Sequence, residues 1–456
     1  MKLEVSVGEA IDKLSILHLK QKKIKNKQKL AEIEKEIREL SQCNELIKKY
    51  NDYYRQLMYV NEEIWDMTDL IKGMILNENP HFFASISNKI FNFNQKRFRL
   101  KNLFNILVDS SLKEQKSYAA TCCKIHIENL NILFDKFTEI NYLCIEYDKV
   151  VFDSPCDKTI AIIENIYHHF ISNDLECVKT INISNFNLSD KLIRVFEFTP
   201  ITYVAGGLFG DFIHELSVIN EMFYNTGRKG ILYLSNQGDV FRFGLKNTFH
   251  DTYETICSQP YIHKYSIYNN EPVDINLSSW RTTPYLYNGN WNYVFKSTFS
   301  VDWGKHKWIN TRIDNKWQNK VVVNTSDRRF VSIEIDFDLL YKQYGNDIVF
   351  LSMKPDFSDY SHFYSNTGVF LNAYYIKTFT EMCTIINSCK LFVGTLSGPL
   401  SISHATQTRR IICDYLTKNE YKQPVADSHH IVGLDSVWSN AFLSVEDEIK
   451  DSEKTL

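Results

Sequence analysis

One stretch, from Thr199 to Glu215, constrains the fold of this chain more than any other. Its first half is apolar, and Tyr203 and Val204 favour the pleated state, so the pattern predicts a buried strand. The strand is followed by a loop with three glycines and then by the start of a helix. This order is typical of an open parallel α/β sheet, which places its chemistry at the carboxyl ends of its strands.

The loop contains Gly206, Gly207 and Gly210, which allow backbone N–H groups to approach a ligand or the strand below. Asp211 follows at the start of the helix, where the helix dipole favours a negative charge. A P-loop is excluded because an acid, rather than Lys-Ser/Thr, follows Gly210, and the spacing also differs from the dinucleotide fingerprint. Two interpretations remain: a ligand-binding loop with a functional Asp211, or a tight turn in which Asp211 only caps the helix.

Predicted strands and helices alternate from about residue 195 onwards, in two blocks. The first block has strands at 196–204, 230–235 and 261–268, with helices at 211–224 and 247–257. The second has strands at 321–326, 347–352, 391–394 and 410–413, with helices at 337–344 and 376–389 and a short helix that opens at Gly398-Pro399. We therefore expect an α/β protein with two Rossmann-type halves and a cleft between them.

An aromatic-rich segment with little periodicity, at 270–318, separates the two blocks. It carries Trp280, Trp291, Trp303, Trp308 and Trp317. Because aromatic faces stack on sugar rings, the segment is a candidate insertion for binding an acceptor. Packing of a loop against its own domain explains the same residues equally well.

Residues 1–118 are expected to be helical. Apolar residues at steps of three and four over 30–47 form a coiled-coil-like seam, and a second stripe covers 11–24. A lysine-rich run interrupts the stripes, which predicts a turn near Lys25–Gln28 and an antiparallel hairpin. The seam should pack against the same chain or a second copy, so a homo-oligomer is one expectation. Further helices are expected at 53–76 and 82–107, separated by Pro80.

The region that follows, 119–194, carries weaker patterns. We expect a strand-like stretch at 142–152 and an amphipathic helix at 157–170. The region is interpreted as a mixed α/β connection between the helices and the first Rossmann-type half.

Composition narrows the function classes. The formal net charge of the 456-residue chain is −3, so nothing indicates binding to nucleic acid or to an anionic membrane. No apolar run is long enough for a transmembrane helix, and the first residues lack the apolar core of a secretory signal. We therefore expect a cytoplasmic protein with reduced thiols. The ten cysteines show no paired C-x-x-C spacing, and neither a metal site nor a cofactor is expected.

The segments 206–214 and 391–400 together resemble two motifs of the lipopolysaccharide heptosyltransferase family. The first is similar to the family's opening glycine–aspartate loop and the second to its donor loop, and Glu381 matches the family's donor-binding pattern. The resemblance covers about residues 195–440. It implies a GT-B glycosyltransferase fold, a nucleotide-sugar donor and inversion at the anomeric carbon. Residues 3–118 resemble a bacterial helical domain of unknown function, which implies no catalytic residue.

The patterns and the resemblance together predict four domains. These are a helical domain at 1–118, a mixed α/β connecting region at 119–194, an acceptor domain with the aromatic-rich insertion at 195–318, and a nucleotide-sugar donor domain at 319–445. The acceptor would be a glycan or another hydroxyl-bearing molecule.

Glycosyl transfer requires a base that takes the proton of the acceptor hydroxyl. Asp211 is the candidate because it follows the glycine loop at the expected carboxyl end of a strand. His214 and Glu215, one turn further along the same predicted helix, are the alternatives.

The departing nucleotide diphosphate must also be stabilised. Arg328 and Arg329, just after a predicted strand, are the candidates to provide bidentate, charge-assisted bonds. A solvated pair in a polar turn explains these two arginines equally well. The helix start at Ser397-Gly398-Pro399 offers free N–H groups, and Thr395 and Ser397 add hydroxyl donors. With these groups present a divalent metal is not required, so metal-independent transfer is expected.

Two departures from the family motif support a different interpretation. Leu396 stands where the family has an acid, and Ser401 where it usually has a histidine. The alternative is a non-catalytic nucleotide-sugar-binding or scaffold protein with a degenerate glycosyltransferase fold. A nucleotide-dependent oxidoreductase is a third class, which the absence of the dinucleotide fingerprint disfavours.

Overall fold

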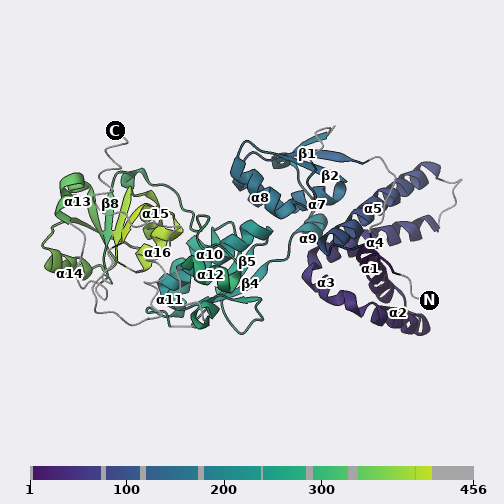
Figure 1. Cartoon of the computed structure of the whole chain (residues 1–456), viewed down its shortest axis with the longest axis horizontal. Helices are drawn as coiled ribbons and strands as arrows, with labels where there is room; N and C mark the ends of the chain where they lie inside the picture. Colours follow the sequence, from purple (N-terminus) through teal and green to yellow (C-terminus); the bar gives the residue numbers. More distant parts are fainter. Residues whose placement is uncertain are drawn as a thin grey trace. The chain divides into compact units, whose positions relative to one another are not determined.

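The computed structural model describes residues 4–72, 79–112, 120–172, 179–237, 240–283, 291–326, 337–395 and 397–412. The chain divides into two compact units, unit 1 (Met1–Thr199) and unit 2 (Pro200–Leu456). Figure 1 shows the helices and strands of both units. The predicted boundaries at 118 and 318, which lie inside these units, stay predictions. Among the described helices, none has both the length and the apolar character needed to cross a membrane.

The first half of unit 1 is helical, as the sequence predicts. Its helices are α1 (Val7–Lys23), α2 (Lys27–Glu39), α3 (Asn44–Lys49), α4 (Asn51–Lys72) and α5 (Pro80–Leu107). Asn26 caps α2 by accepting the amide of Lys29, and the short turn before it joins α1 and α2 into the predicted hairpin. The seam predicted over 30–47 is not continuous, because α2 ends at Glu39 and a 3₁₀ turn, Ser41–Cys43, precedes α3.

A buried ion pair joins α1 to α4 and α5 in unit 1. The carboxylate of Asp12 is almost fully buried and accepts hydrogen bonds from Arg97 Nη2 (2.6 Å) and Nε (2.9 Å). Asn61 on α4 donates a third bond, at 3.0 Å, to the same carboxylate. Leu57 and Leu100 are fully buried in the same core. The packing of these three helices therefore depends on a charge that has no access to water.

The second half of unit 1 is a small parallel sheet with helices. Its elements are β1 (Cys122–His126), α6 (Leu130–Asp135), α7 (Phe137–Glu146), β2 (Lys149–Asp153), α8 (Asp157–Tyr167), β3 (Lys179–Asn182) and α9 (Asp190–Phe196), and the strand order is β2-β1-β3. The strand predicted at 142–152 is wrong over its first half, where α7 stands, whereas α8 confirms the helix predicted at 157–170. Cys122 is disulfide-bonded, which differs from the reduced thiols expected.

Unit 2 begins with the predicted strand, glycine loop and helix. Its first sheet is built from β4 (Ile201–Gly206), α10 (Phe209–Thr226), β5 (Gly230–Ser235), α11 (Leu245–Cys257), β6 (Ile262–Ile267) and β7 (Ile275–Asn276), followed by α12 (Trp291–Phe299). The strands are parallel in the order β6-β5-β4-β7. In chain order this is 3-2-1-4, the order of a Rossmann sheet.

The second sheet of unit 2 repeats this order with one more strand. Its elements are β8 (Val321–Asn324), α13 (Phe337–Tyr344), β9 (Ile348–Ser352), α14 (Ser358–Thr367), β10 (Asn372–Tyr375), α15 (Phe379–Ser388), β11 (Leu391–Gly394), α16 (Gly398–Ala405) and β12 (Arg410–Ile412). The parallel order β10-β9-β8-β11-β12 reads 3-2-1-4-5. The predicted fold class, an α/β chain with a pair of Rossmann-type sheets after a helical region, is therefore confirmed.

The tryptophans of the segment at 270–318 are structural. All five rings are buried, with Trp291 and Trp308 fully so. Trp308 donates its indole N–H to the carbonyl of Ile213 on α10 at 2.7 Å. Of the two interpretations of this segment, packing against its own domain accounts for these rings, because a buried face does not stack on a sugar.

The ion pair of Asp12 gives the first testable expectation. Asp12→Ala leaves Arg97 and Asn61 without their shared acceptor, and because the side chain of Arg97 is 27% exposed, we expect the free energy of unfolding to fall by about 1.5–3 kcal/mol. The exposed pair of Lys13 and Glu36 offers a matched control, and Glu36→Ala should cost no more than about 1 kcal/mol. Urea denaturation followed by circular dichroism measures both. Equal losses in the two variants would contradict the role assigned to Asp12.

Candidate functional site

The two glycine-containing loops that the sequence singles out meet in unit 2. The loop after β4 opens α10, and the loop after β11 opens α16. A Cβ built at Gly210 would lie 3.0 Å from Ser401 Oγ, and a Cβ at Gly398 would lie 2.7 Å from the ring of Phe209. Glycine is therefore required at Gly398 for α10 and α16 to approach this closely.

A third helix begins next to this contact. The ring of Phe209, the first residue of α10, packs edge-on against Phe379, the first residue of α15, with 5.5 Å between ring centroids. The amino ends of α10, α15 and α16 therefore converge on one phenylalanine. The helix α10 connects β4 and β5 of the first sheet, whereas α15 and α16 belong to the second sheet. The site is therefore shared by the two Rossmann-type sheets.

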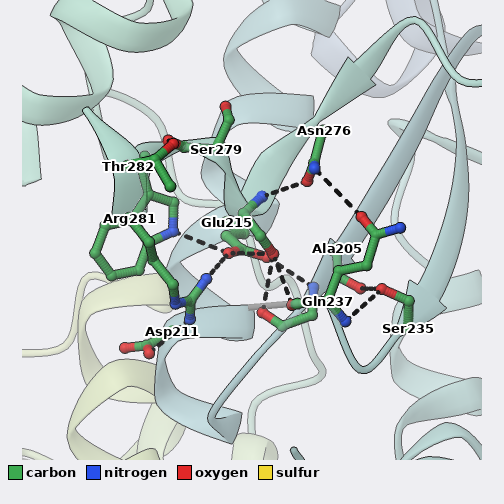
Figure 2. Close-up of polar contacts among 12 residues, drawn as sticks. Ala205, Asp211, Glu215, Ser235, Gln237, Asn276, Ser279, Arg281 and Thr282 are labelled. Atoms are coloured by element: carbon green, nitrogen blue, oxygen red, sulfur yellow. Dashed lines mark hydrogen bonds and ion pairs between the residues drawn. The ribbon is translucent and has the colours of Figure 1, made fainter. Parts of the chain in front are cut away.

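Asp211 lies in the first turn of α10 and is bound to Arg281, as Figure 2 shows. The N-cap residue of α10 is Leu208, so Asp211 does not fill that position. Arg281 Nη2 donates to Asp211 Oδ2 at 2.7 Å, and Arg281 Nη1 donates to Glu215 Oε1 at 2.9 Å. The side chains of Asp211 and Arg281 are 13% and 17% exposed, whereas that of Glu215 is fully buried. One guanidinium thus bridges a partly exposed carboxylate and a buried one.

Glu215 is surrounded by donors. Besides Arg281, its carboxylate accepts the indole N–H of Trp280 at 2.9 Å, the hydroxyl of Ser278 at 3.3 Å and the amide of Gly206 at 3.2 Å. Burial raises the pKa of Glu215 to about 7, although the ion pair with Arg281 and the bond from Trp280 act in the opposite direction. Glu215 therefore anchors the glycine loop and the segment 277–282 to α10.

Gly207 makes room for this arrangement. Its φ of 106° lies in the left-handed region, and a Cβ there would come within 2.1 Å of Arg281 Nη2. Both the backbone conformation and the position of the guanidinium therefore require glycine.

His214, the other alternative base, lies in the interior. It is 3% exposed, and its ring is 4.8 Å from Trp291 and 5.6 Å from His404. Burial and the charge of Arg410 lower the pKa of His214 to about 3. Of the three candidate bases on α10, Asp211 is the one with a partly exposed side chain.

The loop after β11 contains the predicted hydroxyl donors. Thr395 Oγ1 accepts the amide of Ser326 at 2.8 Å, and Ser397, the N-cap residue of α16, donates its hydroxyl to the carbonyl of Thr395 at 3.0 Å. Pro399 stands in the first turn of α16, where its missing N–H costs nothing. Arg328, Arg329 and Leu396 lie outside the described residues.

Glu381 borders a separate pocket at the start of α15. Its carboxylate accepts the hydroxyl of Tyr374 at 2.7 Å and the amide of Lys377 at 2.8 Å. Partial burial acts to raise the pKa of Glu381, but these hydrogen bonds prevail and lower it. The pocket has a volume of about 370 Å³, and its lining also includes Arg312, Lys316 and Trp317. Within the described residues, no group of three or more His, Cys, Asp or Glu side chains forms a metal site.

The structure thus brings together some predicted site residues and adds others. Gly210 lies beside Ser397 and Gly398, and Asp211 is the next residue along α10. Gly207 lies against Arg281 and Gly206 against the backbone of Ser235 and Gln237, while Glu381 lines its own pocket. Sequence reasoning missed Arg281. Its signal is the spacing of Asp211 and Glu215, because two acids four residues apart on one helix face repel each other and require a cation.

Comparisons with known proteins match one part of the chain to a family. Residues 1–132 match a family of unknown function (DUF6165), which confirms the resemblance expected for the N-terminal helices. A search of the curated proteins found no match.

Several solved structures are distantly similar. The iron-containing dodecameric glycosyltransferase TibC from enterotoxigenic E. coli is 10% identical with a TM-score of 0.32, and the match covers 46% of this chain and 57% of that protein, just over half of its length. E. coli heptosyltransferase WaaC is 9% identical with a TM-score of 0.33 over 57% of this chain and 100% of WaaC. A family 9 glycosyl transferase from Veillonella parvula is 11% identical with a TM-score of 0.24, and the match covers 75% of this chain and 98% of that protein. Such similarity assigns no activity to this chain.

The raised pKa of Glu215 predicts a pH dependence of stability. In the unfolded chain this carboxyl titrates near 4.5, and in the folded chain near 7. Between these values the unfolded state is ionised while the folded state keeps its proton, so the folded state loses stability as the pH rises from 4.5 to 7. Glu215→Gln should remove this decline.

The measurement is the free energy of unfolding of both proteins at several pH values from 4.5 to 8. The difference between wild type and Glu215→Gln should change across this window and stay constant above it. Glu164→Gln, on the exposed side of α8, controls for the loss of one surface charge. Parallel profiles for wild type and Glu215→Gln would refute the assignment.

Proposed function

We propose that unit 2 is a GT-B-type, inverting, metal-independent glycosyltransferase that moves a sugar from a nucleotide-sugar donor to a hydroxyl of a glycan or another acceptor. The observation that carries the proposal is the contact between the Gly210–Asp211 turn of one Rossmann-type sheet and the Ser397–Gly398 turn of the other. Ligands of open α/β sheets bind outside the carboxyl ends of the strands. Here two such ends meet, and the resemblance of both loops to heptosyltransferase motifs points the same way.

On the acceptor side, Asp211 is the proposed base. As the acceptor oxygen bonds to the anomeric carbon, the bond from that carbon to the nucleotide diphosphate breaks and the hydroxyl proton passes to Asp211. A single displacement of this kind inverts the anomeric configuration. Glu215 and His214 are less suited to the role because their buried side chains do not reach an acceptor.

On the donor side, the diphosphate is proposed to bind at the start of α16, near Thr395 and Ser397, with Arg328 and Arg329 compensating its charge. The pocket beside Glu381 has the size of a small-ligand site and is proposed to hold the rest of the nucleotide. Cationic side chains in these positions would do the work that a divalent metal does in other transferases.

One observation favours the alternative, a non-catalytic nucleotide-sugar-binding or scaffold protein. Ser401, which replaces the usual histidine of the family motif, is buried, and its hydroxyl donates to the carbonyl of Ser397 at 3.3 Å. A hydroxyl bonded to its own helix is poorly placed to bind a sugar. The two functions differ in turnover but not in donor binding, so an assay of both separates them.

The proposal also covers the cellular location of the protein, its contact with a second copy and the role of unit 1. A cytoplasmic location is proposed from the sequence alone, and the hairpin of α1 and α2 is the proposed contact with a second copy of the chain. Unit 1 carries none of the residues assigned to donor or acceptor, so it is proposed to be dispensable for donor binding.

Asp211→Asn tests the enzyme against the binding protein. The amide keeps the shape of the side chain but takes no proton, so kcat should fall by roughly 10²–10⁴. Affinity for a nucleoside diphosphate should stay unchanged. Turnover is measured as nucleoside diphosphate release from ADP-, GDP- and UDP-linked sugars, with thermal melting as the check on folding. Asp251→Asn, on the exposed side of α11, is the matched control. Full activity in Asp211→Asn would exclude Asp211 as the base.

Arg328→Ala and Arg329→Ala test the donor side. Loss of a hydrogen bond to a charged group costs roughly 1.5–3 kcal/mol, so the variant of the contacting residue should bind nucleoside diphosphate about ten- to a hundredfold more weakly. Isothermal titration gives the affinity, and Arg242→Ala, at an exposed arginine, is the control. If both variants bind like the control, the phosphates bind elsewhere.

A further inference from the structure

We propose that Arg281 is a positioning residue: it holds the carboxylate of Asp211 in place, while the buried Glu215 holds Arg281. This inference rests on the proposed function, because Asp211 is the proposed base. It assigns a role in the reaction to the segment 277–282, which carries none of the sequence-predicted site residues.

The position of the Arg281 guanidinium is fixed from several sides. It lies over the ring of Trp280, with 4.3 Å from its central carbon to the ring centroid. Its two terminal nitrogens each bind a different carboxylate, Nη1 that of Glu215 and Nη2 that of Asp211. Figure 2 shows Arg281 between the two acids, with Asp211 at one end and Glu215 at the other. A planar, rigid fork held in this way transmits the position of the buried acid to the exposed one.

Neutralising Glu215 alone does not explain this arrangement. Glu215 already accepts bonds from Trp280, Ser278 and Gly206, and one guanidinium nitrogen supplies the compensating charge. The second nitrogen is directed to Asp211, whose charge is already favoured by its place in the first turn of α10. A positioning role depends on this second bond, because it is the bond that fixes the carboxylate of Asp211.

The shared guanidinium also suits a base that changes charge. When Asp211 takes a proton it loses its negative charge, and Arg281 keeps its hydrogen bond to Glu215. The guanidinium therefore keeps a buried partner during transfer. A lysine would not hold both acids in this way, because an ammonium group is a point charge without the planar fork that binds two carboxylates at once.

Arg281→Lys is the first test. Lysine keeps the charge that Glu215 requires, but it does not hold Asp211 in a fixed geometry. Because small misplacements of a reacting group cost up to about 10²-fold in rate, we expect kcat to fall by roughly 10- to 100-fold. The KM for the nucleotide sugar and the affinity for nucleoside diphosphate should be unchanged. Arg242→Lys, at an exposed arginine outside these contacts, should behave like wild type.

A double variant separates positioning from structure. Arg281→Gln combined with Glu215→Gln removes both partners of the buried pair, so no fully buried charge is left without its counter-charge, and the fold should be retained, as thermal melting will show. If Arg281 only neutralises Glu215, this variant keeps wild-type kcat, which would overturn the proposal. If Arg281 positions Asp211, kcat falls as it does in Arg281→Lys.

A cycle with Asp211→Asn completes the test. A residue that acts through Asp211 should have no further effect once the base is gone, so Arg281→Lys in that background should leave the residual rate unchanged. An additive loss would overturn the proposal. Absence of turnover in the wild-type protein with ADP-, GDP- and UDP-linked sugars would overturn the proposed function and with it the role of Arg281. A wild-type kcat in Arg281→Lys would overturn the role of Arg281 alone.

Discussion

The site of unit 2 depends on one buried charge, the carboxylate of Glu215. A carboxylate without access to water is costly unless its oxygens are paired and hydrogen-bonded. The chain meets this requirement with donors from two separate segments: the amide of Gly206 at the end of β4, and the side chains of Ser278, Trp280 and Arg281 in the segment 277–282. The same bonds dock the segment 277–282 on the glycine loop, so the interaction that satisfies Glu215 also builds the surface next to Asp211.

The second constraint is the close approach of neighbouring groups to the backbone of the two loops, which glycine permits at Gly207 and Gly398. Gly207 leaves space for the guanidinium of Arg281, and Gly398 leaves space for Phe209. The first turns of α10 and α16 therefore approach closely because Gly398 carries no side chain. The sequence marks these positions because glycine is costly wherever it is not needed. It does not reveal that the two loops meet each other, since that contact joins residues almost two hundred positions apart.

Local patterns predicted local structure well and long-range contacts poorly. The buried strands β5 and β11 begin and end where the apolar runs do. A strand covered on both faces is a continuous apolar run, so the ends of the run mark the ends of the strand. By contrast, residues 142–146 of α7 lie in the stretch that the sequence predicts as a strand, because a short apolar run fits either state. The contacts of Arg281 with Asp211 and Glu215 join residues 70 and 66 positions apart. No local sequence pattern predicts these contacts. The only local signal is the pair of acids on α10, whose mutual repulsion favours a nearby cation.

The geometry of α10 explains why a single helix carries both the structural and the reactive acid. Asp211 and Glu215 stand four residues apart, so they lie on the same face, one turn above the other. The first turn reaches the surface, while the second lies against Trp280 and the glycine loop, and exposure falls from 13% to zero within that turn. The buried acid gives up access to an acceptor and gains fixed partners, whereas the exposed acid keeps its access and takes its position from the buried one. A helix with a partly exposed first turn and a buried second turn therefore supplies both the proposed base, Asp211, and the buried acid, Glu215, that helps to position it. This requires a cation that bridges the two carboxylates.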